Sequence, residues 1–221
     1  EMERFDPLSR TRCGLAAFAV LFSTSLLFAG LNTLRYSLNH ENENTNESIR
    51  RPSSASIATW SNKTMQEKYM RRCIELAEEA RAKGGAPYGA LIVDPSTDTI
   101  VAEGANNASH NPIWHGEMEA ITNLSRRSVP SVYEIAETLE LYTSAEPCPM
   151  CMGAIGWSGF GRVYYGTSIP FIADHGQDQI AIRAKEVSRK TTFHHITVIG
   201  GVLADETNKL YAPGNRIRHR L

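Results

Sequence analysis

Two short stretches of this chain combine residue types that can hold a metal ion and move a proton. The first is His115-Gly116-Glu117, and the second is Pro147-Cys148-Pro149-Met150-Cys151. One imidazole and two thiolates supply three zinc ligands, which leaves the fourth tetrahedral position free for water, as in catalytic zinc sites. Glu117 stands two residues after the histidine, where its carboxylate can reach that water without binding the metal. The pattern therefore indicates a catalytic metal centre at which a carboxylate carries protons.

Both stretches occur in the order and at a spacing that one enzyme superfamily uses. The pattern H-x-E followed by P-C-x-x-C is the signature of zinc-dependent nucleobase deaminases, and Cys148 lies 33 positions after His115. On these residues, the segment from about residue 65 to residue 211 resembles the cytidine-deaminase-like superfamily. Within it, the run from Ser144 to Ile155 is most similar to guanine deaminases and tRNA adenosine deaminases.

The resemblance implies a cofactor, a reaction and a set of partners. Zn²⁺ held by His115, Cys148 and Cys151 would supply hydroxide near neutral pH, and this hydroxide would attack the amine-bearing ring carbon and release ammonia. Glu117 would carry the proton from the water to the ring and then to the departing amine. The implied substrate is a free nucleobase or nucleoside, with a guanine-type purine slightly ahead of cytosine, and the implied assembly is a homodimer.

Other functions stay open at this point. A tRNA or polynucleotide adenosine deaminase is supported by the same resemblance and by the basic tail 216–220, whereas the formal net charge of −1 provides no overall basic field for nucleic acid. A non-enzymatic, zinc-stabilised scaffold subunit is disfavoured by Glu117, because a structural site does not need this carboxylate. A closed structural zinc site would require a fourth ligand, for which His110 is the nearby candidate.

Four further residues are candidates for substrate binding. The resemblance assigns Asn106 to hydrogen bonding with the base or sugar, and the alternative is an asparagine that caps a turn. Trp114 stands where the family usually has a small residue, so its indole can stack on a base or narrow access to the pocket. Phe171 and Asp178 lie where family members close the pocket with a loop, and Asp178 can recognise a ring N–H. Aromatic and acidic residues in such loops also serve packing and solvation.

The order of helix and strand patterns predicts the scaffold that positions these residues. Helices are expected over 64–83, 115–124, 149–157, 178–187 and 203–211, and strands over 88–93, 100–105, 139–143, 163–166 and 196–200. Strands that alternate with helices imply a layered α/β sheet. The resemblance refines this to a three-layer α/β/α fold, with about five strands in a mixed sheet and helices on both faces. Both metal motifs then begin helices, whose N-termini favour thiolate over thiol.

The N-terminal part of the chain differs in composition from the rest. Residues 1–38 contain an apolar run, Leu15–Leu31, preceded by two arginines. This arrangement is typical of a signal peptide or signal anchor, and it predicts membrane association through the N-terminal segment, with the catalytic domain outside the cytosol. Residues 39–62 are polar and poor in large apolar side chains, which predicts a disordered tether. Residues 63–221 form the predicted CMP/dCMP-type zinc deaminase domain.

Overall fold

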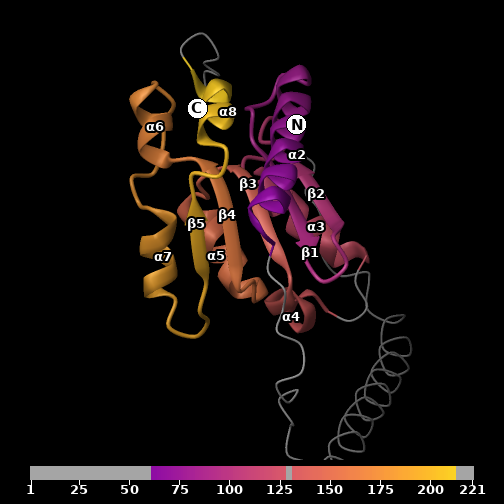
Figure 1. Cartoon of the computed structure of the whole chain (residues 1–221). Coiled ribbons are helices and arrows are strands. Elements are labelled where there is room, and N and C mark those ends of the chain that lie inside the picture. Colours follow the sequence, from indigo (N-terminus) through magenta and orange to yellow (C-terminus); the bar gives the residue numbers. More distant parts are fainter. Residues whose placement is uncertain (1–60, 128–130, 213–221) are drawn as a thin grey trace, which may run out of the picture. The chain divides into compact units, whose positions relative to one another are not determined.

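The protein is described here by a computed structural model that covers residues 61–127 and 131–212, all within the compact unit Ser56–Leu221 (Figure 1). Five strands form one sheet in the order β2-β1-β3-β4-β5. Strand β1 pairs antiparallel with both β2 and β3, whereas β3–β4 and β4–β5 are parallel pairs. The sheet is therefore mixed, as predicted. The strands are β1 (Gly89–Asp94), β2 (Thr99–Ala105), β3 (Glu140–Ala145), β4 (Arg162–Thr167) and β5 (Thr197–Gly200).

Helices cover both faces of this sheet. On one face, Tyr69, Met70 and Cys73 of α2 (Lys63–Ala82) pack in the same cluster as Leu91 and Val93 of β1. The neighbouring residues of β1 point to the opposite face, because successive strand residues alternate between faces. They join a second cluster with α3 (Gly116–Arg127), α5 (Pro149–Ser158) and α7 (Ala184–Lys190). This arrangement confirms the predicted three-layer α/β/α fold.

Short helices complete the described part of the chain. They are α4 (Val132–Ile135), η1 (Ala136–Thr138), α6 (Ile169–Asp174), α8 (Ala204–Thr207) and η2 (Asn208–Tyr211). The last two together occupy the predicted helix over 203–211. Helix α6 was not predicted, although the sequence contains a helix-start signal for it. The Ser168 hydroxyl caps the helix by accepting the Phe171 N–H, and Pro170 stands in the first turn.

The predicted helix over 178–187 is wrong in its first half. Helix α7 begins only at Ala184, and residues 177–183 run without helical structure. The physical reason is a distant hydrogen bond, because the carboxylate of Glu146 accepts the Ala184 N–H at 2.9 Å and thereby fixes the first turn. Residues 178–180 of this non-helical segment form part of a cavity wall instead.

A close backbone approach sets the distance between β2 and the first metal motif. A Cβ atom added at Gly104 of β2 would lie 2.2 Å from the carbonyl oxygen of Gly116 and 2.3 Å from the backbone nitrogen of Ala120. A residue without a side chain is therefore required here. This close contact holds the end of β2 against the start of α3. Asn106 directly follows β2 and His115 directly precedes α3, so the contact positions both residues.

None of the helices in residues 61–127 and 131–212 is long and apolar enough to cross a membrane. The predicted apolar leader and all but the last two residues of the predicted tether lie outside the described residues. Asn62, one of those two, caps α2 by accepting the Met65 N–H at 3.1 Å. The leader, the membrane association, the location outside the cytosol and the homodimer thus stay predictions.

We predict that Gly104→Ala destabilises the domain by about 2–3 kcal/mol, because the new methyl group would overlap backbone atoms of α3 that cannot move independently. Gly153→Ala in α5 is the matched control, since nothing lies within 4 Å of a Cβ added there. Alanine is the better helix former by about 0.8–1.0 kcal/mol, so the control is expected to be neutral or stabilising. Urea unfolding measures both variants, and equal unfolding midpoints would contradict the close approach.

Candidate metal and substrate site

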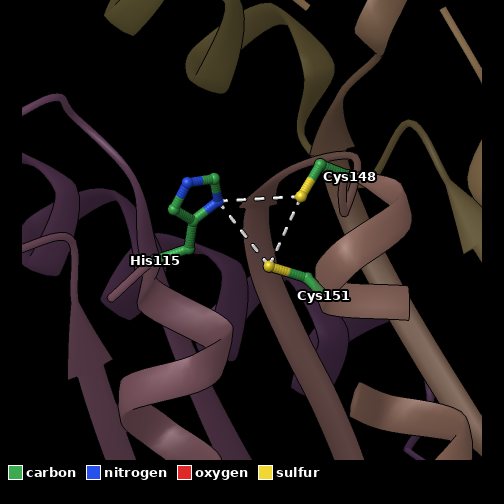
Figure 2. Close-up of side chains that lie close together, drawn as sticks. All are labelled: His115, Cys148 and Cys151. Atoms are coloured by element: carbon green, nitrogen blue, oxygen red, sulfur yellow. Dashed lines mark hydrogen bonds between the residues drawn. The ribbon is translucent and has the colours of Figure 1, made fainter. Parts of the chain in front are cut away.

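The three predicted zinc ligands meet at one point, although they come from separate parts of the chain. Figure 2 shows the side chain of His115 pointing toward those of Cys148 and Cys151. Nδ1 of His115 lies 3.7 Å from each Sγ atom, and the two Sγ atoms are 3.7 Å apart. A tetrahedral ion bonded at about 2.3 Å to sulfur and about 2.0–2.1 Å to nitrogen spaces such atoms about 3.6–3.8 Å apart. The donor types and their spacing therefore fit zinc.

Both motifs stand at helix starts, as predicted. Cys148 is the N-cap residue of α5, with extended backbone angles, and Pro149 follows at the position where a missing N–H costs nothing. One helical turn then returns Cys151 to the same side as Cys148. His115 precedes α3, and its carbonyl oxygen accepts the Glu119 N–H at 3.0 Å in the first turn of that helix.

Mutual hydrogen bonds set the protonation of the three donors. Hydrogen bonds with Cys151 and then with His115 hold the pKa of the Cys148 thiol at about 4, against the opposing effect of burial. The hydrogen bond with Cys148 and burial together raise the pKa of Cys151, and the hydrogen bond with Cys148 raises that of His115. One sulfur is thus ready to bind a cation, and the remaining protons leave when a metal ion binds.

Glu117 lies beside the metal ligands but is not one of them. The cluster that can hold a metal ion in the described residues consists of His115, Cys148 and Cys151, so no fourth protein ligand is present there. Glu117 is 5% exposed, and burial raises the pKa of its carboxyl group. Its Oε1 accepts the Thr143 hydroxyl at 3.1 Å, so strand β3 fixes its orientation. Thr143 was not predicted from the sequence, since its contact with Glu117 joins residues 26 positions apart.

A cavity of about 140 Å³ opens beside these residues. Of the four predicted substrate-binding residues, Asn106 and Asp178 lie in its wall, together with His115, Glu117 and Cys148. The wall also contains residues that the sequence did not indicate, namely Tyr88, Ala145, Glu146, Gln179 and Ile180.

The other two predicted substrate-binding residues are not in the wall of this cavity. Trp114 stacks on His110, with ring centroids 5.3 Å apart, and Phe171 stacks on His175 at 4.0 Å. Both aromatic rings thus have a partner close in sequence. His110 is also outside the metal cluster, which removes the candidate for a closed, four-ligand zinc site.

Asn106 lies in the cavity wall and has a buried hydrogen-bond donor that is not used. Its side chain is 6% exposed, and its Nδ2 has no hydrogen-bond partner among the described residues. Its backbone N–H donates to the Tyr88 carbonyl oxygen at 2.8 Å, which fixes the main chain.

Glu146 connects the metal motif to the segment that walls the cavity. Its side chain is fully buried, and it forms an ion pair with Arg183 at 2.8 Å. It also accepts the backbone N–H groups of Ile169 and Ala184, each at 2.9 Å. The two N–H groups belong to the ends of the segment that contains Asp178, so one carboxylate holds both ends of this segment beside the second metal motif.

Comparisons with known proteins agree with this geometry. Residues 63–167 match the family model of the cytidine and deoxycytidylate deaminase zinc-binding region. The chain is 36% identical over 140 residues to a guanine deaminase of Bacillus subtilis, an alignment that covers 60% of this chain and 86% of that protein. It is 34% identical over 145 residues to a tRNA-specific adenosine deaminase of Haemophilus influenzae, which covers 65% and 79% respectively.

A solved structure shares the fold as well as the sequence pattern. The guanine deaminase of Nitrosomonas europaea superimposes with a TM-score of 0.58 at 26% identity, over 66% of this chain and 81% of that one. A probable cytosine deaminase of Schizosaccharomyces pombe is 32% identical over 145 residues, which covers 62% of this chain and 85% of that protein. The relatives therefore share a reaction type but differ in substrate.

We predict that Glu146→Ala destabilises the domain by about 2–4 kcal/mol, because two buried N–H groups lose their acceptor at about 1–3 kcal/mol each. Glu186→Ala is the matched control, since Glu186 is 41% exposed and its ion pair with Lys190 spans 3.9 Å. Such a surface pair contributes about 1 kcal/mol or less. Urea unfolding of the zinc-loaded proteins compares them, and equal losses in the two variants would refute the role given to Glu146.

Proposed function

The chain belongs to the cytidine and deoxycytidylate deaminase family and is a zinc-dependent hydrolytic deaminase, and we propose that its substrate is a free nucleobase. A guanine-type purine ranks ahead of cytosine, and nucleosides rank below both. The observation that carries this proposal is the small cavity beside the three donors, whose wall includes Asn106, a residue with a buried and unpartnered amide N–H group.

The size of the cavity supports a single base. At about 140 Å³ it is smaller than the pockets of about 300–1,000 Å³ that hold drug-sized ligands. A base can enter it edge first, whereas the sugar of a nucleoside would have to remain outside. The similarity to two guanine deaminases supports the purine, because guanine is the base on which those two proteins act.

The proposed catalytic groups surround this cavity. A zinc ion bound by His115, Cys148 and Cys151 would supply a Lewis acid that lowers the pKa of water to about 7. Glu117, held by Thr143, would take one proton from the water that attacks the amine-bearing carbon and pass it to the ring nitrogen. It would then take the second proton from the newly added hydroxyl and pass it to the amine, which leaves as ammonia when the carbon–nitrogen bond breaks.

The proposed binding groups complement the edge of a base. The Nδ2 hydrogens of Asn106 donate to a ring or exocyclic acceptor, which removes the cost of a buried donor without a partner. The carboxylate of Asp178 accepts from a ring N–H at the mouth of the cavity. Both interactions hold the base while Glu117 transfers the proton.

We predict that Glu117→Gln keeps its zinc but loses about 10²–10⁴-fold in kcat, because the carboxylate moves protons and does not bind the metal. His115→Ala is expected to lose zinc together with stability, since metal binding and folding are coupled. Metal analysis and ammonia release measure the two effects. Zinc loss in Glu117→Gln, or undiminished turnover by it, would refute the assigned role.

We predict that guanine has the highest kcat/KM in a panel with guanosine, cytosine and an anticodon stem-loop, and that guanosine is at least about tenfold poorer. The assay is ammonia release at two salt concentrations. Removal of residues 216–221 is expected to leave guanine turnover unchanged. Preferred deamination of the stem-loop, with a steep salt dependence that falls on removal of this tail, would establish the polynucleotide alternative instead.

A further inference from the structure

Two glutamines that the proposed chemistry does not use share one tyrosine hydroxyl at the cavity. The Tyr88 hydroxyl donates to Oε1 of Gln177 at 3.1 Å and accepts from Nε2 of Gln179 at 3.4 Å. Tyr88 and Gln179 are in the cavity wall, whereas Gln177 is 5% exposed and lies behind them. The three side chains thus form a short hydrogen-bonded relay that ends at the substrate cavity.

The single hydroxyl proton links the orientations of the two amides. A tyrosine hydroxyl can donate one hydrogen bond, and this one is given to Gln177. Only oxygen lone pairs remain for Gln179, so its amide must turn a N–H toward Tyr88. The Gln179 carbonyl oxygen accepts no hydrogen bond from the described residues, which leaves it available as an acceptor for a ligand.

Surrounding contacts fix the Tyr88 end of the relay. The Tyr88 ring stacks on Tyr211 with centroids 5.3 Å apart and planes inclined by 29°. Tyr211 is fully buried, and its hydroxyl donates to the Pro87 carbonyl oxygen at 2.9 Å. Burial raises the pKa of Tyr88 to about 12, so its hydroxyl keeps the proton at neutral pH. Gln179 is therefore oriented by a rigid group rather than by solvent.

We propose that Gln179 is a specificity-determining residue whose carbonyl oxygen accepts a ring N–H of the substrate, and that Tyr88 is the positioning residue that orients it. The inference rests on the proposed function, because it assumes that the ligand in the cavity is a nucleobase. A free guanine carries an N–H in its five-membered ring, at N7 or N9 according to the tautomer. A methyl group or a glycosidic bond at that nitrogen removes the donor.

The test compares guanine, 7-methylguanine and 9-methylguanine as substrates of the zinc-loaded protein. Wild type is expected to disfavour at least one methylated base by about tenfold or more in kcat/KM, as sites built to pair an N–H do. Gln179→Leu is expected to raise KM for guanine about tenfold while kcat changes less than about threefold, and to abolish that discrimination. Gln179→Glu keeps an acceptor oxygen and is expected to restore the discrimination against the methylated base.

Tyr88→Phe tests the positioning role, because it keeps the stacked ring and removes the hydroxyl. It is expected to raise KM by about three- to tenfold and to weaken the discrimination in part. Two controls match these changes away from the cavity. Gln66→Leu removes a side-chain amide of α2 that donates to the Ser61 carbonyl oxygen, and Tyr133→Phe alters a side chain of α4 in a residue that is 73% exposed.

The outcomes separate this inference from the proposed function. Guanine turnover with the same methyl discrimination in wild type and Gln179→Leu would overturn the inference alone. The inference would also be overturned if Gln179→Glu lost the methyl discrimination as Gln179→Leu does. That result would mean that Gln179 presents its N–H groups to the base and not its carbonyl oxygen. A wild-type protein that neither binds nor deaminates guanine would overturn the proposed function and this inference with it.

Discussion

Three donor atoms from two helices have to stay within 3.7 Å of one another, and much of the fold serves that requirement. Helices α3 and α5 pack on the same face of the sheet, so their N-terminal ends can be brought together. The absent side chain at Gly104 lets β2 press against α3. Strand β3, buried along its whole length, leads directly into the second motif. Each of these features limits how far one helix start can move from the other.

The same crowding explains which polar groups near the site are paired. Glu146 is fully buried, and its carboxylate has an arginine and two backbone donors. Glu117 has the Thr143 hydroxyl. Asn106, by contrast, keeps an unused donor in the cavity wall. Since buried polar groups are normally paired, this unpaired donor in a residue of the cavity wall supports the proposed role of Asn106 in binding the base.

The sequence predicted those parts of the protein that local pattern determines. The ligand spacing around His115 and Cys148 and the order of helix and strand patterns need no knowledge of distant contacts, and the metal cluster and the sheet were predicted correctly. The start of α7 depends on a carboxylate 38 positions earlier, so the helical pattern over 178–187 was misleading. The relay between Tyr88 and Gln179 spans 91 positions and follows no motif.

The two aromatic candidates are not in the wall of the cavity, and their role in substrate binding stays a prediction. Trp114 and Phe171 stand in the right stretches of chain, but position in a sequence does not determine where a side chain points. Each ring stacks on a histidine four residues away, Trp114 on His110 and Phe171 on His175. Such short-range stacking competes with any role in the cavity wall.

The two carboxylate oxygens of Glu146 accept the Ile169 and Ala184 N–H groups. The two ends of the segment between these residues are therefore held close together. A loop closed in this way can change its length or composition at small entropic expense, about 0.6 kcal/mol for each doubling. The metal ligands lie outside the loop and would not move. Ring preference can therefore diverge by exchange of this one segment, while the hydrolytic centre stays as it is.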